Sequence, residues 1–132
     1  MTPEKTVLIV EDDGIVAMDI EEELSGRGWR CLGVAGTLDA ATQSVERCLP
    51  DLAVLDVNLR GCHSYDLARL LRDRGAAVVF LSGNSPLDLP QDLRDCAFVQ
   101  KPVSYEHLVT VLTRSLPECA QIPVAADRQA EP

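Results

Sequence analysis

Polar residues suited to phosphoryl chemistry follow four hydrophobic runs of the chain. Glu11-Asp12-Asp13 follows the run over residues 6–10, Asp56 follows 52–55, Ser82 follows 78–81, and Lys101 follows 97–100. Carboxylates are ligands that Mg²⁺ prefers, and a protein-bound Mg²⁺ commonly shares phosphate oxygens. A lysine and a hydroxyl can neutralise and hydrogen-bond the remaining phosphate oxygens. Together these residue types indicate a site for a divalent cation and a phosphoryl group.

The acidic residues form the expected metal site. Asp13 and Asp56 would coordinate the cation through carboxylate oxygens, with Asp12 acting directly or through water. The backbone carbonyl of Asn58, two residues past Asp56, would supply a further oxygen. Without the metal these carboxylates repel one another, so we expect the pKa of at least one of them to rise.

Asp56 is the expected nucleophile, because it stands alone at its strand end and faces the acidic pair. An aspartate can attack phosphorus and form an aspartyl phosphate once charge on the phosphoryl group is neutralised. We expect Lys101 to be the counter-ion of the phosphoryl group and Ser82 to be its hydrogen-bond donor. A single such residue at a strand end is usually a turn residue or a cap, but four in this order are hard to assign to chance.

Strands that alternate with helices would bring these residues to one place. Apolar residues recur at helical spacing in four segments: Val16, Ile20 and Leu24; Leu38, Ala41, Val45 and Leu49; Leu67, Leu70 and Leu71; and Leu108, Val109, Leu112 and Leu116. This alternation predicts an α/β fold with a doubly wound, five-stranded parallel sheet of the flavodoxin-like order 2-1-3-4-5. In that order the first and third strands are neighbours, so Asp12 and Asp13 would face Asp56 across a crevice.

Local signals predict where the elements begin and where they are interrupted. Pro86 and Pro90 oppose a full-length helix, so the fourth helix is expected to be short or irregular. The segment 58–61 after Asp56 is expected to be a loop. The expected helix N-caps are Thr37 or Asp39, Ser64 and Ser104.

Length and composition indicate one domain over residues 1–116, followed by a flexible tail over 117–132. The net charge of −9 opposes direct binding to nucleic acid or to an anionic membrane, since both favour a basic face. No apolar stretch is long enough to cross a bilayer and no secretory signal is evident, which predicts a cytoplasmic protein. Five cysteines without a Cys-x-x-Cys pair oppose a disulfide framework or structural zinc site.

As a set, these motifs resemble those of the receiver domains of bacterial two-component response regulators, over about residues 5–116. The resemblance assigns the acidic metal pocket to Glu11-Asp12-Asp13, the phospho-acceptor to Asp56, the switch hydroxyl to Ser82, the Lys-Pro motif to Lys101-Pro102, and the rotating aromatic to Phe98. It implies a phosphoprotein that binds Mg²⁺ and receives its phosphoryl group from a sensor histidine kinase or a histidine phosphotransfer protein. The expected output is a surface that changes conformation on phosphorylation and binds a downstream protein target. The resemblance also allows a homodimer.

The chain further resembles a subgroup of stand-alone receivers in proteobacteria, with a Phe-Ala-Thr-Gly-Tyr-like loop and a shortened fourth helix. We therefore expect a single-domain regulator that takes part in a phosphorelay. It would be no metabolic enzyme, since it catalyses only its own phosphorylation and hydrolysis. The proline commonly found after the phospho-acceptor is absent, so we expect the loop there to be more mobile.

Two other functions remain as alternatives. A magnesium-dependent phosphatase with an aspartyl nucleophile would place that nucleophile at the end of the first strand and an acid/base Asp two residues later. Here Asp12 and Asp13 are adjacent, and a cap domain would not fit in this length. A binding module that no longer accepts phosphate usually lacks an acidic residue or the lysine, and neither is lost here.

Overall fold

The structure, a computed structural model, describes residues 5–116, so the tail expected over 117–132 lies outside the described residues. The strands are β1 (Lys5–Val10), β2 (Trp29–Ala35), β3 (Leu52–Asp56), β4 (Asn58–Leu59), β5 (Cys62–His63), β6 (Ala77–Ser82) and β7 (Ala97–Gln100). The helices are α1 (Gly14–Gly26), α2 (Leu38–Arg47), α3 (Tyr65–Asp73) and α4 (Tyr105–Ser115). Among these residues no helix combines the length and apolar character needed to cross a membrane.

Five parallel strands form the main sheet in the order β2-β1-β3-β6-β7. When only the five strands of this sheet are numbered along the chain, the order is 2-1-3-4-5, which confirms the prediction. β1 and β3 are neighbours, with Val10 level with Leu55. Their carboxyl ends therefore meet at one edge of the sheet, next to the end of β6.

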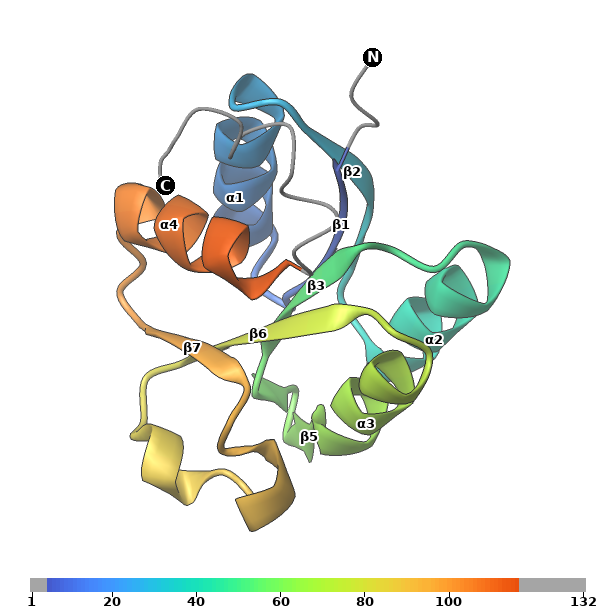
Figure 1. The fold of residues 1–132 in the computed structure, drawn as a ribbon, viewed down its shortest axis with the longest axis vertical. Coiled ribbons are helices and arrows are strands. Elements are labelled where there is room, and N and C mark those ends of the chain that lie inside the picture. Colours follow the sequence, from blue (N-terminus) through green and yellow to red (C-terminus); the bar gives the residue numbers. More distant parts are fainter. Residues whose placement is uncertain (1–4, 117–132) are drawn as a thin grey trace, which may run out of the picture.

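Two hydrophobic layers enclose the sheet, with α1 and α4 on one face and α2 and α3 on the other (Figure 1). The strand side chains alternate between these layers, as the period of two residues requires. In β1, Val7 and Ile9 pack toward α1 and α4, whereas Leu8 and Val10 pack toward α2 and α3. All four are buried, which explains why the strand is an unbroken apolar run.

Side-chain capping explains where α2 and α4 begin. The side chains of Thr37 and Ser104 accept hydrogen bonds from the backbone amides of Ala40 and His107, which confirms both as N-caps. Leu49 was expected on the buried side of the second helix, but this was wrong, because α2 ends at Arg47 and Leu49 is 41% exposed. The following residue is Pro50, which forces its predecessor into extended backbone and so ends the helix early.

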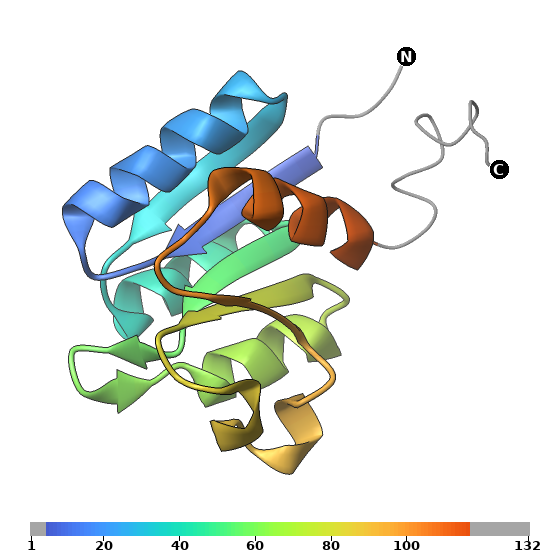
Figure 2. The ribbon, with the colours of Figure 1, turned by 90° about the vertical axis from the view of Figure 1, so that its left-hand side faces the viewer.

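The segment between β6 and β7 contains two short 3₁₀ turns in place of a fourth long helix, as the prolines predicted. They are η1 (Pro86–Asp88) and η2 (Gln91–Leu93), and η2 lies beside α3 (Figure 2). Leu89 and Leu93 bury their side chains in the layer beneath. The guanidinium of Arg69 in α3 donates to Asp92 at 2.8 Å, which ties the segment to the domain.

Candidate functional site

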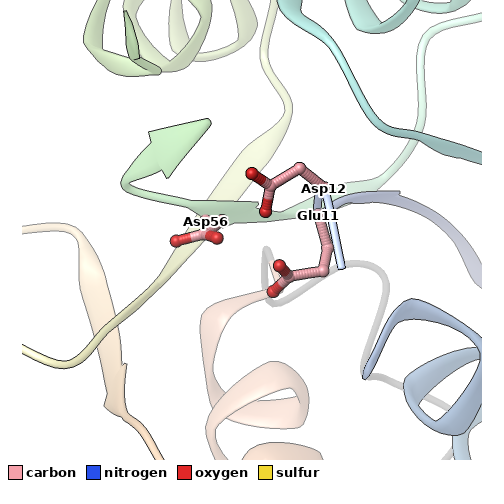
Figure 3. Close-up of side chains that lie close together, drawn as sticks. All are labelled: Glu11, Asp12 and Asp56. Carbon is pink, nitrogen blue, oxygen red and sulfur yellow. The ribbon is translucent and has the colours of Figure 1, made fainter. Parts of the chain in front are cut away.

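Three carboxylates gather where β1 and β3 end (Figure 3). Glu11 and Asp12 directly follow β1, and Asp56 is the last residue of β3. One oxygen from each of the three lies within 4.8 Å of the others. Glu11 is 2% exposed and Asp56 is 7% exposed, so the cluster is largely shielded from solvent.

Asp13 was expected to bind the metal, but the structure gives it another position. It is the N-cap of α1, where its Oδ1 accepts hydrogen bonds from the amides of Ile15 at 3.0 Å and Val16 at 3.3 Å. Among the described residues the acidic group contains Glu11 in its place. The structure therefore replaces Asp13 by Glu11 as a member of the acidic cluster, while the binding of a cation by these side chains stays a prediction.

The alternation of β1 explains this correction. Val7 and Ile9 face the α1 and α4 layer, and Glu11 continues the same period of two residues beyond the strand end. Its side chain consequently turns toward Lys101 rather than toward solvent. This alternation was the signal in the sequence that could have identified Glu11.

Lys101, the residue after β7, connects two members of the acidic cluster. Its Nζ donates to Glu11 Oε1 at 3.1 Å and to Asp56 Oδ2 at 3.2 Å. Burial works against the charged ammonium, but the hydrogen bond to Glu11 and the charge of Asp56 outweigh it and raise the pKa of Lys101. The lysine therefore stays protonated and supplies a fixed positive charge beside Asp56.

Burial is the main cause of a shift in the pKa of Glu11. Burial raises this pKa to about 6, although hydrogen bonds from the Asp13 amide and from Lys101 oppose the change. The negative charge of Asp56 raises it further. The pKa that rises is thus that of Glu11, which was not among the expected metal ligands, and burial rather than charge repulsion is the main cause.

Ser82 and Phe98 lie on the other side of Asp56. Ser82 is buried at the end of β6, and its Oγ accepts a hydrogen bond from the Asn84 amide at 3.0 Å. Phe98 in β7 is half-buried and lines a cavity of about 240 Å³ together with Ser82 and Tyr65. A hydroxyl near Asp56 and a half-buried aromatic ring thus share one space.

Two residues that follow Asp56 in the sequence donate hydrogen bonds to it. The amide of Asn58 donates to Asp56 Oδ1 at 3.4 Å, while the metal role of the Asn58 carbonyl stays a prediction. Ser64 was expected to cap α3, but it makes no side-chain cap. The Ser64 hydroxyl instead donates to the Asp56 carbonyl at 2.8 Å, a contact that the sequence analysis missed.

The segment 58–61 is more regular than the loop expected there. β4 and β5 form an antiparallel hairpin in which Leu59 pairs with Cys62. At its turn the amide of Arg60 donates to Asp12 Oδ2 at 3.1 Å. The hairpin therefore contacts the acidic cluster, and sequence reasoning also missed this contact.

The donor set suits a hard divalent cation. Three carboxylates surround the site, and Lys101 is the one ammonium that contacts them in the described part of the chain. The negative charge therefore exceeds the positive charge when the acids are ionised. Oxygen donors with excess negative charge are the ligands that Mg²⁺ prefers, so Glu11, Asp12 and Asp56 fit this ion.

The sequence matches a known protein family and several known proteins. The family profile of the response regulator receiver domain matches residues 7–113. The transcriptional regulatory protein PdtaR of Mycobacterium tuberculosis is 32% identical over 112 residues, which cover 82% of this chain and 55% of that protein. The DNA-binding response regulator MtrA of Mycolicibacterium smegmatis is also 32% identical, over a stretch that covers 82% of this chain and 49% of MtrA. This chain spans about half the length of these curated relatives.

Solved structures with the same fold point to the same family. The solution structure of SdrG from Sphingomonas melonis Fr1 matches with a TM-score of 0.74 and 34% identity, over 85% of this chain and 96% of SdrG. The response regulator PhyR from Brucella abortus matches with a TM-score of 0.77 and 25% identity, over 96% of this chain and 54% of PhyR. Since the family profile spans most of the chain, the protein described here belongs to the response regulator receiver domains of two-component systems.

Proposed function

We propose that this receiver accepts a phosphoryl group on Asp56 and thereby switches a protein-binding surface. The donor would be the phosphohistidine of a sensor histidine kinase or of a histidine phosphotransfer protein. The observation that carries the proposal is the setting of Asp56, a buried carboxylate within reach of Lys101 and of two further acidic residues. A carboxylate in such a setting is shielded from water, and the Lys101 ammonium beside it can neutralise charge on an incoming phosphoryl group.

The proposed transfer is a single displacement at phosphorus. An oxygen of Asp56 attacks the phosphorus atom, a P–O bond forms, and the P–N bond to the donor imidazole breaks. The imidazole leaves with the electron pair of that bond and takes up a proton. Transfer of a phosphoryl group depends mainly on positioning and charge neutralisation, which Lys101 and the backbone around Asp56 supply.

A divalent cation is part of the proposal. Glu11, Asp12 and Asp56 would hold it, with the carbonyl of Asn58 as a further ligand. When bound, Mg²⁺ neutralises negative charge on the phosphoryl oxygens. The protein's own contribution is to keep Lys101 protonated beside Asp56 and Glu11 and to fix the Asp56 backbone through Ser64.

We infer that Ser82 and Phe98 carry the signal away from the site. The Ser82 hydroxyl would turn to the phosphoryl group, and Phe98 would move further into the cavity that both residues line. This would shift the population between two surface conformations rather than create a new one. The net charge of −9 favours a protein target over direct contact with nucleic acid.

Intact-mass measurement after incubation with a small phosphoryl donor such as phosphoramidate tests the proposal. We expect one added phosphoryl group in the presence of Mg²⁺, none in Asp56→Asn, and none with EDTA. A protein that stays unlabelled would contradict phosphoryl acceptance. Steady turnover of a small phosphoester without a labelled protein would instead favour the magnesium-dependent phosphatase.

A further inference from the structure

We propose that the backbone amide of Arg60 positions Asp12 for cation binding, so that the turn of the β4–β5 hairpin is part of the metal site. The inference rests on the proposed function, since it concerns the cation that would assist phosphorylation of Asp56. Arg60 would act as a positioning residue, because its amide contacts a metal ligand and not the metal.

The hairpin has the geometry of a two-residue turn with a left-handed backbone. Leu59 and Cys62 are paired, and the two residues between them have positive φ angles, +51° at Arg60 and +86° at Gly61. Two successive positive φ values define the tight turn whose twist suits a hairpin. Arg60 is the one non-glycine residue between 5 and 116 with a positive φ. Its Cβ makes this conformation uncommon, so a compensating interaction is expected there.

The compensating interaction is a hydrogen bond to the acidic cluster. The Arg60 amide donates to Asp12 Oδ2 at 3.1 Å, across 48 residues of sequence. Within residues 5–116 no hydrogen bond is directed at the other oxygen of Asp12, Oδ1. The amide thus holds the carboxylate in one orientation and leaves an oxygen available to a cation.

The hairpin is itself held in place at its base and in the core. Leu59 is buried, and the amide of Gly61 donates to the Asn58 side chain at 3.0 Å. The amide of Ser64 donates to the Val57 carbonyl at 3.0 Å, directly after Asp56. The amide of Asn58 at the base donates to Asp56 Oδ1 at 3.4 Å, so the same short segment contacts two of the three carboxylates.

The side chain of Arg60 takes no part in this contact. Residue 60 is exposed, and the bond to Asp12 is made by the main chain alone. Groups that orient a metal ligand through a hydrogen bond typically change metal affinity by about 10–100-fold when they are lost. Substitutions that keep the amide N–H should therefore leave the Mg²⁺ affinity unchanged, whereas a substitution that removes it should lower the affinity.

Calorimetric titration of Mg²⁺ into the metal-free protein measures these affinities and tests the inference. Arg60→Ala and Arg60→Gly keep the N–H and should bind Mg²⁺ close to the wild-type Kd. Arg60→Pro removes the N–H and excludes a positive φ, and it should raise the Kd roughly tenfold or more. A smaller loss in Arg60→Pro, or an equal loss in Arg60→Ala, would overturn the inference. Thermal unfolding of each variant establishes that it is folded.

Amide hydrogen exchange provides a second test if Arg60→Pro does not fold. In the wild-type protein the Arg60 amide should be protected, and in Asp12→Ala this protection should be lost. The Gly61 amide, which donates to Asn58, is the internal control and should stay protected. Unchanged exchange at Arg60 in Asp12→Ala would overturn the inference.

The two proposals fail separately. If the wild-type protein is phosphorylated on Asp56 while Arg60→Pro keeps its Mg²⁺ affinity, only the role of Arg60 is wrong. If Mg²⁺ binding depends on the Arg60 amide but no phosphoryl group is accepted, only the proposed function is wrong.

Discussion

At the level of single residues, the fold disfavours ionisation of Glu11. Burial first, and then the charge of Asp56, raise its pKa from 4.5 to about 6. Between these pH values the folded state binds more protons than the unfolded state, so the free energy of unfolding falls as pH rises. The stabilisation is present below pH 4.5 and is lost as pH rises through about 6.

Glu11→Gln should remove this pH dependence. In metal-free buffer, the stability of the wild-type protein relative to Glu11→Gln should fall by up to about 2 kcal/mol between pH 4.5 and neutral pH. Urea unfolding of both proteins across this range measures the difference. Parallel pH profiles would contradict the shifted pKa of Glu11.

Asp12 and Asp13 should have separable roles although they are adjacent. Asp13→Ala should destabilise the protein by about 1 kcal/mol through loss of the α1 cap, with Mg²⁺ affinity retained. Asp13→Ser keeps a capping side chain and should restore most of that stability. Asp12→Ser should abolish measurable Mg²⁺ binding. Loss of Mg²⁺ binding in Asp13→Ser would show that Asp13 is a ligand after all.

At the level of secondary structure, the irregular segment between β6 and β7 depends on two buried leucines. Leu93 is fully buried, whereas Leu87 in the same segment is 72% exposed. Leu93→Ala should cost about 2–5 kcal/mol of stability and speed hydrogen exchange over residues 83–96. Leu87→Ala is the matched control and should change stability by less than about 0.5 kcal/mol. Equal effects of the two substitutions would contradict the packing of η2.

These elements differ in how far the sequence predicts them. The strand ends and the broken fourth helix were predictable, because unbroken apolar runs and the prolines at 86 and 90 act locally. The β4–β5 hairpin was not, since its Arg-Gly turn lacks the Asn-Gly pair that marks such turns. Residue type alone did not separate Glu11 from Asp13, because both are acidic; the alternation of β1 was the signal that places Glu11 in the cluster, whereas Asp13 caps α1.

At the level of the whole molecule, the parallel sheet places the acidic cluster and the cavity lined by Ser82 and Phe98 near one edge. Asp56 ends β3, Ser82 ends the neighbouring β6, and Phe98 lies in β7 beyond it. The cavity lined by Ser82 and Phe98 connects this edge to the segment over residues 83–90, since Asn84, Ser85, Asp88 and Leu89 also line it. The proposed path from Asp56 to the surface runs through the residues that line this cavity.

Phe98→Ala should interrupt this path. With Mg²⁺ and beryllium fluoride, a phosphoryl mimic, amide resonances of the wild-type protein should shift both around Asp56 and over residues 83–96. In Phe98→Ala the shifts around Asp56 should remain and those over 83–96 should largely disappear. Two-dimensional NMR spectra of both proteins provide the comparison. Identical shifts in both proteins would exclude Phe98 as the connecting residue.

The most direct test of the whole account is the identity of the residue that carries the phosphoryl group. Borohydride reduces an aspartyl phosphate to homoserine, which marks the modified position permanently. After phosphorylation in Mg²⁺ and reduction, peptide mapping should find homoserine at position 56 and at no other aspartate. Homoserine at Asp12 or Asp13, or none in the whole chain, would contradict the assignment of Asp56 as the phospho-acceptor.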